Sequence, residues 1–134
     1  MENFSTKSLE LALNSLNLAW NEYNKDSAND FVRDSVIQRF EYTYALAVKY
    51  IQRYLELNLP VADDVDKLTF NDLIRTANEK GILLGNLSDW AIYRQRRNIT
   101  LHTYNIEKAK QVLDIIEQFC NEVEYLLGKI NEQY

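Results

Sequence analysis

Residues 94–105, with the sequence RQRRNITLHTYN, bring together side chains that can bind an anion and move a proton. They include three arginines, Arg94, Arg96 and Arg97, and the only histidine of the chain, His102. Guanidinium groups stay charged at physiological pH and bind phosphate through paired hydrogen bonds, whereas an imidazole exchanges protons near neutral pH. The segment therefore predicts a site for a phosphate-containing ligand.

Positive charge is concentrated in this segment although the chain as a whole is acidic. The formal net charge is −5, yet residues 91–106 contain three arginines and no acidic residue, while residues 111–134 contain five acidic residues and one lysine. An acidic chain does not coat nucleic acid through its overall field, so an anionic ligand has to bind at a local site. The alternative is that the arginines pair with carboxylates of neighbouring helices.

The five-residue spacing of Arg97 and His102 decides whether their side chains can meet. On an unbroken α-helix five residues turn about 140°, so the two side chains would diverge. They can converge within one chain if the helix breaks, and β-branched residues together with Asn105, a good N-cap, favour a break within residues 100–105. They can also converge across a dimer in which each chain supplies part of the site.

An imidazole beside arginines can cleave RNA without a metal ion. Neighbouring guanidinium groups disfavour the protonated form of His102, and a neutral imidazole can take the proton of a ribose 2′-hydroxyl. Arginine can stabilise the charge that develops on the attacked phosphate. Tyr104 lies two residues after the histidine, and Trp90 and Tyr93 could offer a face on which a base stacks or could pack in the core.

Other kinds of site find little support in the sequence. One histidine and one cysteine, Cys120, cannot make a zinc site within a single chain, and Cys120 occupies an apolar helical position typical of a buried thiol. Asp64 and Asp66 fall in a segment expected to be a solvated loop, with no Gly-Ser phosphate-binding motif before it. We therefore expect no metal ion and no cofactor, and the chain lacks the parts to transfer a nucleotide by itself.

Apolar spacing predicts that helices position these residues. Steps of three and four residues predict a helix over residues 6–24 and a longer one that begins near Val36 and stops before Pro60. The second helix carries apolar rows around much of its surface, which indicates a central position or a place at an oligomer interface. The acidic segment after Pro60 is expected to be a loop.

The second half of the chain contains three further predicted helices. Thr69 is a predicted N-cap of a short helix that reaches Lys80, with Gly81 as its C-terminal cap. Ser88 is the predicted N-cap of a fourth helix. From Ile106 to Ile130 apolar residues recur in alternating steps of three and four, which predicts one long final helix.

Together the patterns predict an all-α fold, an up-and-down bundle of four to five helices in a single domain over residues 1–134. Three glycines and one proline are too few for the turns of many short strands. The sequence has no run of 18 apolar residues and no export signal, so we expect a cytoplasmic protein without membrane contact.

Residues 97–104, RNITLHTY, match the R-x4-H-x-Y signature of the HEPN superfamily, small helical bundles named for their occurrence in eukaryotes and prokaryotes and for nucleotide binding. The chain resembles in particular the nucleotidyltransferase substrate-binding protein branch. The resemblance extends through VIQRFEYTYALAVKYIQRYLE at residues 36–56 and DWAIYRQRRNITLHTYNIEKA at residues 89–109, and it covers most of the chain.

This resemblance implies a homodimer encoded beside a minimal nucleotidyltransferase. In several such pairs, which act as toxin and antitoxin, the HEPN chain is a metal-independent ribonuclease that the partner blocks by binding or by attaching adenylate to the motif tyrosine. Carried over to this sequence, Arg97 would be the phosphate-binding catalytic arginine, His102 the catalytic histidine and Tyr104 the modification target. RNA, or a nucleotide, would be the ligand.

The branch is also described as a non-catalytic subunit that presents substrate to the nucleotidyltransferase, and the sequence allows this role. The intact arginine and histidine favour the ribonuclease, because a passive binding surface needs no proton acceptor. Arg94, Arg96 and Asn98 are the further candidates for binding phosphate or a nucleotide, with no step assigned to Asn98.

Overall fold

A computed structural model describes residues 4–60 and 62–134 of the protein. In these residues it contains six α-helices, two short 3-10 helices and no strand. Their bounds are α1 Lys7–Lys25, α2 Asp30–Asn58, η1 Ala62–Lys67, α3 Phe70–Glu79, α4 Leu87–Asn98, η2 Thr100–His102, α5 Ile106–Leu113 and α6 Ile116–Gln133. The predicted all-α bundle is confirmed.

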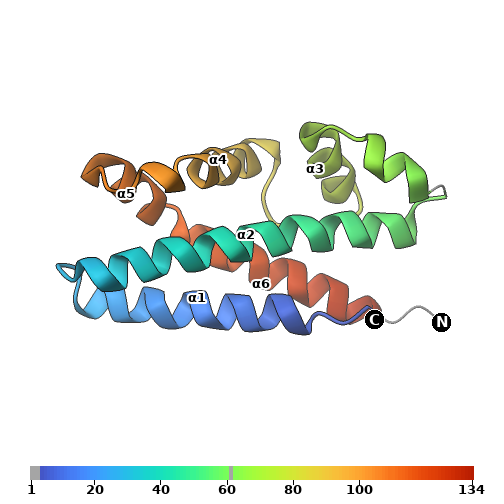
Figure 1. Ribbon diagram of the computed structural model, residues 1–134. Helices are drawn as coiled ribbons and strands as arrows, with labels where there is room; N and C mark the ends of the chain where they lie inside the picture. Colours follow the sequence, from blue (N-terminus) through green and yellow to red (C-terminus); the bar gives the residue numbers. More distant parts are fainter. Residues whose placement is uncertain (1–3, 61) are drawn as a thin grey trace.

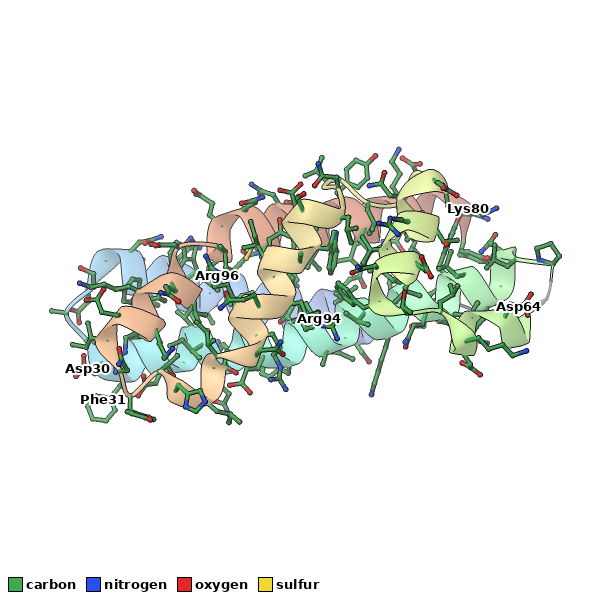
Figure 2. All side chains as sticks on the ribbon, turned by 90° about the horizontal axis from the view of Figure 1, so that it is seen from above. Asp30, Phe31, Asp64, Lys80, Arg94 and Arg96 are labelled. Atoms are coloured by element: carbon green, nitrogen blue, oxygen red, sulfur yellow. The ribbon has the colours of Figure 1, made fainter. Side chains whose placement is uncertain are left out.

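The other helices pack around α2, the longest helix (Figure 1). Its 29 residues make it about 43 Å long. In Figure 1, α1 runs antiparallel to α2 and lies with α6 on its lower side, while α3, α4 and α5 lie above it. Seen from above in Figure 2, α4 lies across α2 instead of running along it. This crossing places the end of α4 beside the first half of α2.

Local chemistry explains where α2 begins and ends. The Asn29 side chain accepts the backbone N–H groups of Phe31 and Val32 at 3.0 and 3.2 Å, so it satisfies two of the free donors of the first turn. At the other end Leu59 is extended, with φ −103° and ψ 152°, as a residue before proline prefers. The predicted stop before Pro60 is confirmed.

The acidic segment that follows is η1 instead of the expected loop. Val65 is buried, and the N–H of Leu68 donates to its carbonyl at 3.1 Å. The predicted ends of the next helix are both confirmed. Thr69 accepts the N–H of Asp72 at 3.1 Å and caps α3, and Gly81 follows the helix with φ 79°.

The N-cap of α4 is Asn86 and not the predicted Ser88. Asn86 accepts the N–H of Asp89 at 3.1 Å, and the Asp89 carboxylate accepts the N–H of Asn86 at 3.0 Å. This reciprocal pair needs an acceptor three residues after the cap. Asn86 has one in Asp89, whereas Ala91 stands three residues after Ser88 and has no polar side chain.

The predicted long helix over residues 106–130 is wrong, because the chain bends between α5 and α6. The N–H of Ile115 donates to the carbonyl of Val112, three residues back, at 3.3 Å, which interrupts the α-helical register. Apolar spacing continues through the bend since residues on both sides of it are buried. The bend lets α5 lie with α4 while α6 packs with α1 and α2 (Figure 1).

Aromatic rings join α4 to α2 and α6. Trp90 and Tyr93 of α4 are almost fully buried and meet edge to face, with ring centroids 5.3 Å apart. Tyr93 packs on Phe119 of α6 at 5.3 Å, and Phe119 packs on Phe40 of α2 at 5.0 Å. Packing in the core is therefore the role of Trp90 and Tyr93, and neither ring is available for stacking on a base.

A buried carboxylate holds the segment before α4 against α6. Glu122 is 1% exposed and accepts the N–H groups of Leu84 and Gly85, both at 2.7 Å. Burial raises the pKa of the Glu122 carboxyl, and the two backbone donors oppose that increase. A Cβ on Gly85 would lie 2.7 Å from Oε1 of Glu122 and 2.8 Å from Oδ2 of Asp89, so only glycine fits without displacement.

The close approach at Gly85 can be tested with two alanine variants. Gly85→Ala has to move the Glu122 carboxylate, so we expect it to lower the free energy of unfolding by about 1–3 kcal/mol. Gly128→Ala is the control, because Gly128 lies inside α6 and the added Cβ would have no described neighbour within 4 Å beyond the local helix backbone and the adjacent residues. Removing glycine from a helix interior should raise the free energy of unfolding by about 0.5–1 kcal/mol. Urea denaturation measures the free energy of unfolding of both variants. Equal values would contradict the close contact between Gly85 and the Glu122 carboxylate.

Candidate functional site

The motif residues lie on a tight turn between α4 and α5. The α-helix ends at Asn98, and the hydroxyl of Thr100 donates to the carbonyl of Arg97 at 2.9 Å. The N–H of His102 donates to the carbonyl of Ile99 at 2.9 Å and so forms the 3-10 turn η2. The predicted break between the fourth helix and the next is confirmed.

Asn105 fixes the far end of this turn. Its N–H donates to the carbonyl of His102 at 3.0 Å, and its side chain accepts the N–H groups of Glu107 and Lys108 at 2.9 and 3.3 Å. Asn105 is thus the N-cap of α5, as predicted. Hydrogen bonds at both ends give the turn a defined backbone, which positions its side chains better than a loose loop would.

His102 and Tyr104 are both exposed on this turn and contact each other. Their rings meet edge to face at a centroid distance of 6.2 Å and an angle of 77°. Tyr104 is 84% exposed, and its neighbours Leu101 and Ile106 are 76% and 57% exposed. Large side chains of this kind are seldom left in solvent together without a binding role.

The three arginines have different surroundings. Arg96 donates to the carbonyl of Gln111 at 3.1 Å and to the Gln95 side chain, so it joins α4 to α5. The guanidinium of Arg94 lies over the ring of Phe70, 4.6 Å from its centroid. Figure 2 shows that Arg96 and Arg94 leave α4 on opposite sides, toward α5 and toward α3. These contacts give both arginines structural roles that the sequence did not reveal.

Arg97 is half-buried, and its guanidinium has no hydrogen bond or ion pair with any residue that the structure describes. The alternative interpretation is that the arginines pair with carboxylates of neighbouring helices. Among the described residues none of the three arginines forms such a pair. Arg97 and Arg94 lie close to Tyr44 of α2. Burial raises the pKa of Tyr44 to about 12, and the two positive charges oppose that increase. Asn98 is exposed at the end of α4.

A groove separates the turn from α2. Side chains of Arg33, Gln38 and Glu41 line it on α2, and those of Thr100, Thr103 and Tyr104 line it on the turn. We call it the α2–η2 groove, and its volume is about 260 Å³. Sequence reasoning missed both the groove and Tyr44. The only signal was the spacing of polar residues along α2, which does not say which helix faces them.

The described residues also bear on metal binding, on Cys120 and on membrane contact. No group of three His, Cys, Asp or Glu side chains in the described residues could hold a metal ion. Cys120 is buried, and burial raises the pKa of its thiol to about 12, as expected for a core cysteine. None of the helices in the described ranges is long and apolar enough to cross a membrane.

The chain is similar to known proteins in both sequence and fold. Residues 4–132 match the family described as nucleotidyltransferase substrate binding protein like. A Haemophilus influenzae protein named probable ribonuclease HepT is 35% identical over 114 residues, which are 85% of this chain and 77% of that protein. A solved H. influenzae structure, described as a substrate-binding domain of a nucleotidyltransferase, matches with a TM-score of 0.88 at 31% identity. It covers 95% of this chain and 99% of that one.

The different surroundings of Arg96 and Arg97 predict different effects on stability. Arg96→Ala removes the link from α4 to Gln111, so we expect a loss of about 1–2 kcal/mol in the free energy of unfolding. Arg97→Ala removes a side chain that has no hydrogen bond or ion pair among the described residues, and the change should stay within about 0.5 kcal/mol. Thermal and urea denaturation compare the two. A larger loss of free energy of unfolding for Arg97→Ala than for Arg96→Ala would contradict the structural role assigned to Arg96.

Proposed function

This chain belongs to the nucleotidyltransferase substrate-binding protein branch of the HEPN superfamily, and from this premise we propose that it is a metal-independent endoribonuclease. One observation carries the proposal: an exposed histidine on a defined turn follows an arginine with no carboxylate partner among the described residues. The name of the 35% identical relative, probable ribonuclease, supports the same activity here.

The proposed reaction uses Arg97 and His102 on one phosphodiester, within a subunit or across two. The imidazole of His102 takes the proton of the ribose 2′-hydroxyl, and the 2′-oxygen attacks the neighbouring phosphorus. Arg97 binds the phosphate oxygens and stabilises the added negative charge. The bond to the 5′-oxygen breaks, and that oxygen takes a proton from the imidazolium. The products are a 2′,3′-cyclic phosphate and a 5′-hydroxyl, so atoms and protons balance without a metal ion.

The proposal includes a homodimer and a nucleotidyltransferase partner. Exposed large side chains at the turn, with Phe31 88% exposed at the start of α2, are available for contacts with a second subunit or with the partner. The family description and the solved structure both refer to a nucleotidyltransferase, which supports a partner of that kind, encoded nearby. In this proposal the pair acts as toxin and antitoxin, and the partner blocks the ribonuclease by binding or by attaching adenylate to Tyr104.

A second candidate is a non-catalytic subunit that presents substrate to the nucleotidyltransferase. The descriptions of the family and of the solved structure favour it. In that role Arg97 and the α2–η2 groove would hold a nucleotide or another substrate, and the chain would break no bond. The two candidates differ in what they need from His102, because only the ribonuclease requires its proton transfer.

Purified protein incubated with RNA in EDTA separates the two candidates. We expect wild type to cleave RNA without added metal and His102→Ala to lower the rate about 10²- to 10⁴-fold, because the proton acceptor is lost. Arg97→Ala should lower it about 10²- to 10³-fold through lost charge stabilisation. Gel electrophoresis of end-labelled RNA measures the rates and identifies the cyclic phosphate.

Arg75→Ala is the matched control, because Arg75 is an exposed arginine of α3 that pairs with Asp72 away from the turn. This variant should keep the wild-type rate. Mixing Arg97→Ala with His102→Ala protein should restore cleavage only if the two groups come from different subunits. If wild type and His102→Ala leave RNA equally intact without the partner, the substrate-binding subunit is the better assignment.

The exposed residue Tyr104 is the predicted place where the partner would add adenylate. The tyrosine oxygen attacks the α-phosphorus of ATP and pyrophosphate leaves, so the protein gains the mass of one adenylate. We expect Tyr104→Phe to abolish this gain, whereas Tyr42→Phe, at a tyrosine that is 39% exposed on α2, should leave it unchanged. Intact mass spectrometry after incubation with ATP and the partner measures the gain. Adenylate on Tyr104→Phe protein would place the modification elsewhere.

A further inference from the structure

We propose that the α2–η2 groove is a subsite for a guanine base of single-stranded RNA. This inference rests on the proposed ribonuclease function and specifies which base the enzyme holds next to the motif. The groove lies beside Tyr104 and has a volume of about 260 Å³. Its selectivity follows from which of its polar groups are already paired within the protein and which are free.

The charged pair at one end of the groove is already satisfied. The Nε of Arg33 donates to Asp34 at 3.2 Å, and its Nη1 lies 3.5 Å from a carboxylate oxygen of Asp30. The Arg33 side chain is only 18% exposed, so these contacts hold it against α2. Arg33 therefore neutralises only part of the charge of Asp30 and Asp34, so this end of the groove suits a neutral base better than a phosphate.

The wall on the turn offers surface for stacking and few donors. The hydroxyl of Thr100 donates to the carbonyl of Arg97, and the hydroxyl of Thr103 donates to the carbonyl of Thr100, both at 2.9 Å. Both hydroxyl protons are thus used inside the turn. Tyr104 is 84% exposed, and an exposed aromatic residue next to a groove can stack its ring on any base. This wall holds a base without selecting one.

The selecting groups are Glu41 and Gln38. Neither side chain forms a hydrogen bond or an ion pair with any residue in the described part of the chain. They stand three residues apart on α2 and so share a face, and the buried Ile37 lines the same groove. Glu41 presents two acceptor oxygens, and the Gln38 amide presents donors and an acceptor.

Guanine is the base whose edge fits these two groups. Its N1–H and its 2-amino group are adjacent donors that one carboxylate can accept together, and its O6 is an acceptor for the amide of Gln38. Adenine and cytosine place a ring-nitrogen acceptor where guanine has N1–H, so the carboxylate would face a lone pair. Uracil has a single ring donor between two carbonyl groups. A carboxylate in this position therefore favours guanine and disfavours the other three bases.

Short single-stranded RNA with one guanosine tests the subsite. The guanosine is replaced by inosine, which lacks only the 2-amino group, or by adenosine. Oligonucleotides with 2′-O-methyl groups cannot be cleaved and report binding, while the unmodified ones report cleavage in EDTA. For wild type we expect guanosine to bind about 10- to 100-fold tighter than adenosine, with inosine between them.

Glu41→Gln should abolish this preference, because an amide cannot accept two hydrogen bonds side by side. Glu124→Gln makes the same change on the exposed face of α6 and should keep the preference. Circular dichroism shows whether both variants fold. Equal binding of guanosine and adenosine by wild type, or an unchanged preference in folded Glu41→Gln, would overturn the subsite.

The two assays keep the subsite and the ribonuclease separate. Cleavage in EDTA without dependence on guanosine would leave the ribonuclease standing and remove the subsite. Preferential binding of guanosine without cleavage by wild type would support the subsite and remove the ribonuclease. Preferential cleavage next to guanosine that is lost in Glu41→Gln would support both.

Discussion

The burial of Trp90 and Tyr93 holds α4 across α2, and the candidate site depends on that crossing. The two rings pack with Phe119 and Phe40, so α4, α6 and α2 share one aromatic cluster. Aromatic side chains of this size dominate the packing of a small core and allow little sliding between helices. The end of α4 is therefore fixed beside the first half of α2, where the α2–η2 groove forms.

The three neighbouring arginines of α4 have different contacts, and this difference decides which guanidinium group can bind a phosphate. Arg96 is committed to α5 and Arg94 to the ring of Phe70, so these two arginines stabilise the orientation of α4. Arg97 is the one of the three left without such a contact among the described residues. A guanidinium held near Tyr44 but not neutralised by a carboxylate keeps its charge available for a phosphate. The proposed anion site therefore uses Arg97 alone of the three neighbouring arginines.

Two interruptions of helical structure make the site accessible. The turn at η2 exposes His102 and Tyr104, and its hydrogen bonds give it a defined shape. The bend before Ile116 returns the chain to the core, so that α5 covers one side of the site and α6 can pack with α1. If the last helix were continuous, α5 could not lie beside α4 while α6 fills the core. The apolar spacing of residues 106–130 is therefore divided between two helices: α5 lies beside the candidate site, and α6 packs in the core.

The features that the sequence predicts correctly depend on residues within one helical turn of each other. The stop before Pro60, the caps at Thr69 and Gly81 and the break before Asn105 each follow from local backbone geometry, and the R-x4-H-x-Y motif is also local. Contacts between distant segments follow from the packing of the whole chain and could not be predicted. They produce the groove between α2 and η2, the separate roles of three neighbouring arginines and the bend within a continuous apolar spacing. Apolar spacing shows which face of a helix is buried, but the partner of that face is chosen by the packing of the whole core.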